Sequence, residues 1–466
     1  MNLVASLLCL LVCLTTVTSD RVYVHPFNLF SFNKSTCEEL ESLVQEGKKT
    51  FVPISIESHT TPAYEDDLNN KDELEAPSLN SRGRQELSYL KDSLYVLGRR
   101  FYSVLREVRR GQNLLLSLTS LYGSLVSFYL GASNQTAADL QRLLGFIPPS
   151  GDPDCTSRVD GHKVLSSLRM IENLIKSSNE ELLFSKMLCL FSAPGTALSQ
   201  QFIQDLLPAA DALYARAVDF TNPREAAKQI NAFVEAKTEG QSKCLLANTD
   251  PSADLLFAVD VRLAVNAKQV SQLKEPQEFW VDSNMMVLVP MLSVTGTFKY
   301  KTDASGTFSV VEVPLSKTML LVLLQPINGS DLEHVESQLP LQSSAWLQEL
   351  SPREIKLTLP KLTIEDSSDL QELLSDMELP ALLGKGADLS KISDANLTVG
   401  KVINKAFFKL SGDGTADQPE DPAAQKEDAV FLDITVNKPF LLAVFEEKSR
   451  AMLFLGRVTN PLHHGD

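Results

Sequence analysis

The chain has 466 residues, of which 44% are hydrophobic and 7% aromatic, so it carries enough apolar material for a large packed core. Its formal net charge of −16 at pH 7 argues against nucleic acid or an anionic membrane surface as a partner. These bulk properties predict an acidic, soluble globular protein of the plasma type.

Residues 1–19 have the features of a secretory signal peptide. The stretch contains no charged side chain, has an apolar middle, and ends in Val17-Thr18-Ser19, a small-residue pattern that signal peptidase recognises. We therefore expect cleavage between Ser19 and Asp20 and secretion to the extracellular space. Asp20 would then be the amino terminus of the mature chain.

Residues 20–29, with the sequence DRVYVHPFNL, follow the signal peptide directly. Pro26 disfavours a helix in the residues around it, and apolar residues do not recur at helical spacing anywhere between Asp20 and about Asn33. We therefore expect an accessible, extended tail. The large apolar side chains of Leu29 and Phe30 flank one peptide bond. An aspartic protease binds an extended segment and places such side chains in pockets on both sides of the bond it cuts. A strand or packing patch is the alternative interpretation of these apolar residues.

Residues 30–85 are expected to form a tail and linker rather than a core. From about Glu57 to Gln85 the chain is rich in Asp, Glu, Asn, Ser and Pro and poor in apolar side chains. The folded body is expected over 86–466 and should begin with a helix, because apolar residues recur there at helical spacing. This apolar stripe consists of Leu90, Leu94, Leu97, Phe101 and Leu105.

Helices are expected to dominate as far as about Gly240, and strands afterwards. The apolar stretch 114–130 is too rich in serine and threonine for a membrane span and is interpreted as a buried helix. Further helices are expected at 135–144 and 225–237. Short apolar or alternating runs predict strands at 278–281, 286–289, 297–300, 319–324, 355–359 and 440–445. This order predicts an α+β body.

Cysteines and glycosylation sequons both suit a secreted protein. The cysteines beyond the signal peptide are even in number, and their spacing does not decide among the possible pairings of Cys37, Cys155, Cys189 and Cys244. Asn-x-Ser/Thr sequons predict glycans at Asn33, Asn134, Asn328 and Asn396.

A series of short strings along the chain resembles the serpin family, in serpin order. The strings are LGASNQT (130–136), NAFVEAKT (231–238), VPML (289–292) with Gly296 and Phe298, LPK (359–361), ADLS (387–390), KVINKAF (401–407), PFL (439–441) and FLGRV (454–458). The resemblance covers roughly residues 86–462 and implies the serpin fold, in which helices pack on large, mostly antiparallel β-sheets. Together with DRVYVHPFNL, these strings are similar to a non-inhibitory branch of serpins that are hormone precursors.

This resemblance implies that the chain is a protease substrate. Renin, an aspartic protease, would cut Leu29–Phe30, and a zinc dipeptidyl carboxypeptidase would then remove Asn28 and Leu29, leaving Phe27 as the new carboxyl terminus. Trimming would stop there because the next dipeptide bond, His25–Pro26, is a tertiary amide without an N–H group. The vasoactive octapeptide that would bind a membrane receptor consists of Asp20, Arg21, Val22, Tyr23, Val24, His25, Pro26 and Phe27.

The resemblance also implies a disulfide between Cys37 and Cys155. Its implied role is to position the tail, and the oxidised form would present the scissile bond to renin more readily than the reduced form. Cys189 and Cys244 would then remain outside any disulfide, and their apolar neighbours predict that both thiols are buried.

Two other function classes compete with the precursor role. Most serpins inhibit proteases by inserting a cleaved loop into a sheet, but the matching loop, 414–428, contains prolines and charges that a buried strand would not accept. A carrier for a hydrophobic hormone would leave no recognisable signature. The sequence contains no catalytic or phosphate-binding motif, so we expect neither enzymatic activity nor a cofactor.

Overall fold

The structure is a computed structural model that describes residues 25–37, 49–60, 81–149, 155–176, 182–339, 347, 349–379, 382–415 and 431–463. Within these ranges helices pack against a 13-stranded β-sheet, which confirms the predicted α+β architecture. The predicted signal peptide, residues 20–24 and most of the loop 414–428 lie outside the described residues.

The described helices lie mainly before the long strands in the chain. The α-helices are α4 (Ser81–Val108), α5 (Leu118–Gly131), α6 (Asn134–Leu143), α7 (Gly161–Lys176), α8 (Gln200–Asp205), α9 (Pro223–Lys237), α10 (Leu332–Gln338) and α11 (Leu370–Asp376). Short 3-10 helices are η1 (Pro26–Leu29), η2 (Cys155–Ser157) and η3 (Leu207–Ala209). The helices at 135–144 and 225–237 are thus confirmed as α6 and α9.

All strands predicted after Gly240 are present. The described strands are β1 (Thr50–Phe51), β2 (Leu114–Ser117), β3 (Leu182–Ser192), β4 (Leu198–Ser199), β5 (Ala212–Ala217), β6 (Leu255–Gln272), β7 (Gln277–Trp280), β8 (Met286–Val289), β9 (Met291–Thr302), β10 (Phe308–Pro314), β11 (Met319–Pro326), β12 (Ser351–Pro360), β13 (Leu362–Asp369), β14 (Val399–Thr415), β15 (Leu432–Thr435), β16 (Phe440–Glu446) and β17 (Met452–Val458).

Two long strands of this sheet, β6 and β14, pair in parallel. Their pairing runs from Leu255 opposite Val399 to Gln272 opposite Thr415, with two register shifts. The strands approach so closely that a Cβ atom on Gly412 would lie 2.2 Å from the carbonyl oxygen of Val270, which explains the glycine there. Any further strand inserted between β6 and β14 would have to break this ladder.

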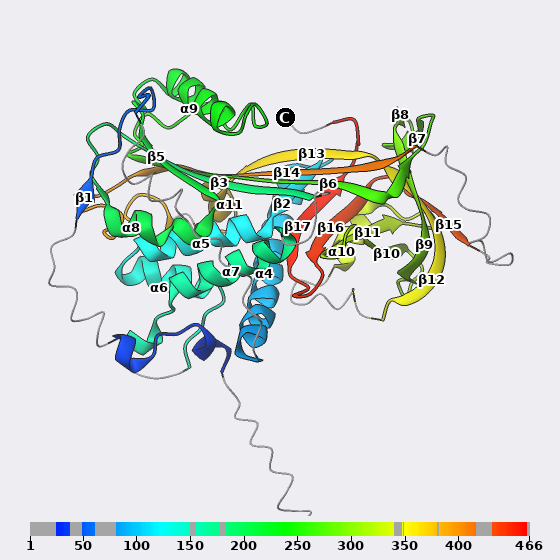
Figure 1. Cartoon of the computed structure of the whole chain (residues 1–466), viewed down its shortest axis with the longest axis horizontal. Helices are drawn as coiled ribbons and strands as arrows, with labels where there is room; N and C mark the ends of the chain where they lie inside the picture. Colours follow the sequence, from blue (N-terminus) through cyan, green and yellow to red (C-terminus); the bar gives the residue numbers. More distant parts are fainter. Residues whose placement is uncertain are drawn as a thin grey trace, which may run out of the picture.

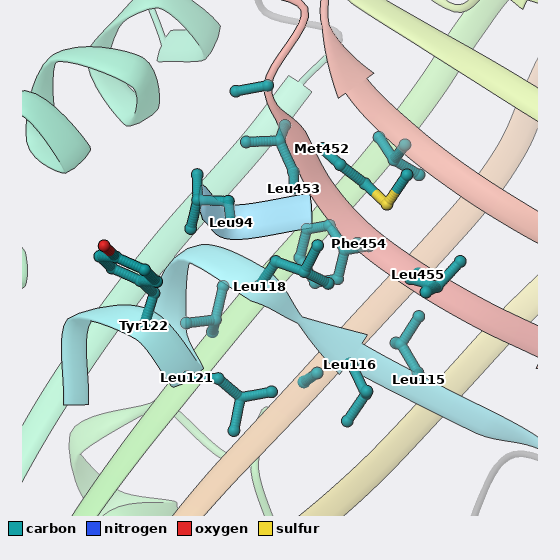
Figure 2. Packing of buried hydrophobic residues seen from close by; sticks show 14 of the residues in the cluster. Leu94, Leu115, Leu116, Leu118, Leu121, Tyr122, Met452, Leu453, Phe454 and Leu455 are labelled. Atoms are coloured by element: carbon teal, nitrogen blue, oxygen red, sulfur yellow. The ribbon is translucent and has the colours of Figure 1, made fainter. Parts of the chain in front are cut away.

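Apolar side chains fill both faces of the sheet. In Figure 1 helices α5 to α8 cover one face and α9 covers the other. Figure 2 shows part of the larger cluster, where Leu94 of α4, Leu118 of α5 and Phe454 of β17 converge. The smaller cluster includes Ile230 and Val234 of α9. Within the described residues, no helix has the length and apolar content that crossing a bilayer would require.

Three predicted features of the folded body need correction. Residues 114–117 form strand β2 instead of the start of a helix, because they pair with β17 and this tertiary pairing outweighs local propensity. Helix α4 begins at Ser81, inside the predicted linker. Strands β3 and β5 precede Gly240 and escaped prediction, because β3 is buried on both faces over most of its length and lacks alternation.

Candidate functional site around the Leu29–Phe30 bond

The segment that precedes the candidate cleavage bond is helical, not extended. Pro26–Leu29 form the 3-10 helix η1, in which Asn28 N donates to His25 O at 2.8 Å and Phe30 N donates to Phe27 O at 3.0 Å. The prediction from Pro26 was wrong because proline occupies the first turn, where the missing N–H would have no partner within the helix. A segment bound in a protease cleft must therefore unwind from this form.

The apolar side chains on both sides of the bond are buried. The exposed fractions are 2% for Phe27, 7% for Leu29 and 0% for Phe30. The Phe30 ring lies 5.4 Å from the Phe146 ring and 6.1 Å from the Tyr89 ring, measured between centroids. The expectation of an accessible tail is thus wrong for these residues, because burial of large apolar side chains is favourable. The alternative interpretation, a packing patch, describes this conformation.

Main-chain hydrogen bonds fix the residues that follow the bond to the segment before α7. Ser31 and Val159 form an isolated antiparallel β-bridge. Asp160 N donates to Phe30 O at 2.7 Å, and Phe32 N donates to Arg158 O at 3.3 Å. Figure 1 shows residues 25–37 in dark blue, beneath α6 and α7 and beside the start of α4.

Lys163 of α7 holds the carbonyl group of the candidate bond itself. Its Nζ donates a hydrogen bond to Leu29 O. The same ammonium lies 2.7 Å from a carboxylate oxygen of Glu86 on α4 and 5.6 Å from the centre of the Phe30 ring. Lys163 therefore connects the bond to two helices by charge-assisted contacts.

Tyr129 of α5 holds Val159, the residue that forms the β-bridge with Ser31. Its hydroxyl donates to Val159 O at 2.8 Å and accepts from Val159 N at 3.0 Å. Burial raises the pKa of Tyr129 to about 12, so the hydroxyl remains protonated and able to donate at neutral pH. Val159, which pairs with Ser31, is thereby fixed to helix α5.

A disulfide joins Cys37 to Cys155, residues 118 positions apart, and confirms the pairing that the serpin resemblance implied. Cys155 begins η2, three residues before Arg158, so the disulfide and the β-bridge hold the segment to one short stretch of chain. Cys189 and Cys244 form no disulfide in the described ranges. Cys189 is buried as predicted, but Cys244 is exposed, because its buried neighbours Leu245 and Leu246 do not carry its thiol inward.

The structure describes some of the remaining predicted site residues and not others. The first half of the peptide, Asp20 to Val24, and the expected cut at Ser19–Asp20 lie outside the described residues. All sequon asparagines are exposed: Asn33, Asn134, Asn328 and Asn396. Sequence reasoning missed Lys163, Glu86 and Phe146, and no local pattern singles out these residues.

Comparison with known proteins identifies the family. The model of the family described as Serpin (serine protease inhibitor) matches residues 93–461. Angiotensinogen of Rattus norvegicus is 40% identical over 99% of this chain and 98% of its own length. Angiotensinogens of Homo sapiens and Bos taurus are 39% and 41% identical, each with the same coverage. The chain belongs to the serpin family, in the angiotensinogen group. As a member of this group it is a non-enzymatic prohormone and a renin substrate.

Solved serpins confirm the fold. The structure of human thyroxine-binding globulin complexed with its hormone superimposes with a TM-score of 0.68 at 20% identity, covering 81% of this chain and 100% of the globulin. Uncleaved ovalbumin gives a TM-score of 0.68 at 21% identity, covering 80% of this serpin and 100% of ovalbumin. The predicted serpin architecture is therefore confirmed.

Proposed function

We propose that renin cuts this precursor at Leu29–Phe30 and releases the decapeptide 20–29, an angiotensin I. The observation that carries the proposal is the sequence DRVYVHPFNL directly behind a predicted signal peptide, in a chain of the angiotensinogen group. Two large apolar side chains on either side of the bond suit the pockets of an aspartic protease. Once the predicted signal peptide is removed, the peptide lies at the amino terminus, so a single cut frees it from the serpin body.

We further propose that cleavage requires release of the segment from its buried position. An aspartic protease binds its substrate extended, whereas Pro26–Leu29 are helical and Phe30 is fully buried. Phe30 must leave the Tyr89 and Phe146 rings, and Leu29 O must lose its bond to Lys163. The folded body thus protects the bond until a release step exposes it.

The later fate of the peptide follows from its chemistry. A zinc dipeptidyl carboxypeptidase would remove Asn28 and Leu29, and the tertiary amide at Pro26 would stop further trimming. The octapeptide that ends at Phe27 would then bind the angiotensin receptor. Around it we propose a division into a signal peptide (1–19), the decapeptide (20–29), a tail and linker that ends where α4 begins at Ser81, and the serpin domain from Ser81 onwards. The protein would be secreted and glycosylated at its sequons.

Incubation of the secreted protein with renin tests the cleavage site. The expected small product has the mass of residues 20–29, and the expected new amino terminus of the body is Phe30. Pepstatin, an inhibitor of aspartic proteases, should prevent the release. A product cut at any other bond, or no product from folded protein that carries an intact amino terminus, would contradict the proposal.

The redox proposal is tested with the same assay. We expect the form with the Cys37–Cys155 disulfide to be cut faster than the reduced form, which is the order that the family resemblance implies; a disulfide that only restrained release of the segment would give the opposite order. A variant with both cysteines replaced by serine should behave as the reduced form and should not respond to reductant. Equal rates for the oxidised and reduced protein would remove the basis for a redox switch.

A further inference from the structure

A cleft lies at the end of helix α4 that is away from the Leu29–Phe30 bond. It has a volume of about 1180 Å³ and opens between the end of α4, the start of α10, the turn that joins β7 to β8, and the ends of β16 and β17. Glu86 and Arg106 mark the two ends of α4, and their separation of twenty residues corresponds to about 30 Å along a helix. The cleft is therefore separate from the Leu29–Phe30 site.

One wall of the cleft is apolar and accessible to solvent. Trp280 at the end of β7 is 37% exposed and Met285 in the following turn is 44% exposed. Leu332, the first residue of α10, completes this wall. An exposed tryptophan beside other apolar side chains in a concave surface is typical of a binding site for a small molecule.

Most carboxylates in the cleft already have partners. Glu336 accepts from Arg457 Nη1 at 3.3 Å and from the hydroxyl of the buried Tyr102. Asp331 accepts from His334 N at 2.8 Å and caps the amino-terminal end of α10. The remaining partnered acids are Asp282, which accepts from the backbone of its own turn, and Glu107, which pairs with Arg110 at 2.7 Å. Glu333 is exposed at the rim and faces Arg110.

Two cations in the cleft retain unused hydrogen-bond donors. The Nη1 atom of Arg106 is buried and has no acceptor, although the Nε atom lies 3.4 Å from Glu107. Lys438 is exposed and forms no ion pair with any described residue. Trp280 N donates to Asn437 O at 2.8 Å, so the residue next to Lys438 is fixed against the tryptophan. The Arg106 side chain is 23% exposed and Lys438 is exposed, so the two cations give this side of the cleft accessible positive charge, which favours an anionic group of a ligand there.

We propose that this cleft binds a small amphiphile that carries one anionic group on an apolar body. Lys438 and Arg106 provide the positive charge for a carboxylate or sulfate, and Trp280, Met285 and Leu332 contact the apolar body. A cation is disfavoured because the acids are engaged by backbone N–H groups, arginines or Tyr102. The volume of about 1180 Å³ is slightly above the roughly 300–1,000 Å³ of typical small-ligand pockets, so the cleft has room for such a molecule.

Titration of the full-length, disulfide-bonded protein with dodecanoate tests the proposal. The chain has two tryptophans, so Trp346→Phe leaves Trp280 as the sole tryptophan reporter of the cleft. We expect a saturable change in Trp280 fluorescence with one site per chain. Lys438→Gln should weaken dodecanoate binding about tenfold, the effect of losing a charge-assisted contact. Binding of uncharged dodecanol should be weaker and insensitive to this substitution.

Lys317→Gln, a change at an exposed lysine outside the cleft, is the matched control and should leave binding unaltered. Arg106→Gln provides a second variant, and an unchanged thermal unfolding midpoint shows that each variant folds. The proposal is overturned if dodecanoate produces no saturable signal. It is also overturned if dodecanol binds as tightly as dodecanoate, or if neither Lys438→Gln nor Arg106→Gln changes the dissociation constant.

Discussion

Renin should fail to cut the protein when residues 31 and 159 are joined by an engineered disulfide. Ser31 and Val159 form an antiparallel bridge whose flanking hydrogen bonds join Phe30 to Asp160 and Phe32 to Arg158. This pattern defines a non-hydrogen-bonded pair, with Cα atoms about 4.5 Å apart, which suits a disulfide. In Ser31→Cys/Val159→Cys the oxidised form should be cut at least about a hundredfold more slowly, because the segment cannot leave as an extended strand.

Reductant provides the control for this lock. It should restore cleavage of the double variant, and wild-type protein under the same conditions supplies the baseline for loss of the Cys37–Cys155 bond. The single variant Val159→Cys measures the cost of shortening a buried side chain, and peptide mapping verifies the pairing. Cleavage of the verified, locked protein at the wild-type rate would show that the segment need not leave the serpin body.

Lys163→Met should have the opposite effect and increase the rate of cleavage of the intact protein. The change removes both the hydrogen bond to Leu29 O and the ion pair with Glu86. Such a charge-assisted contact contributes about 1.5–3 kcal/mol when buried, and partial exposure of Lys163 reduces this to about 1 kcal/mol. If the segment must be released before it is cut, kcat/KM should increase about fivefold.

A synthetic peptide of residues 20–33 serves as the reference substrate. It is not packed against the serpin body, so its rate of cleavage is the rate for a fully released segment and also reports the activity of the renin used. Lys228→Met, which removes an exposed lysine of α9 that pairs with Glu225 at 3.8 Å, should leave the rate unchanged. Glu86→Gln should increase the rate less than Lys163→Met, since the bond to Leu29 O survives. An unchanged kcat/KM in folded Lys163→Met would exclude Lys163 as a restraint on the bond.

Much of the fold could be predicted because its signals are local. The stripe from Leu90 to Leu105 predicted α4, and the pattern at 225–237 predicted α9, which ends at Lys237 as expected. Ordered serpin strings indicated the architecture. The ends of helices and strands were less predictable where pairing between strands decided them. Residues 114–117 form a strand only because β17 lies beside them.

The sequence by itself determined what this protein carries: a predicted leader, the peptide DRVYVHPFNL, the serpin strings and the sequons, all readable from short runs of residues. Only the tertiary structure decided where the Leu29–Phe30 bond lies. Its burial depends on Lys163, 134 positions after Leu29, and on the rings of Tyr89 and Phe146. The physical reason is that the spacing of apolar side chains shows which face of a helix or strand is apolar. Whether a given bond is buried depends instead on contacts between segments far apart in the chain.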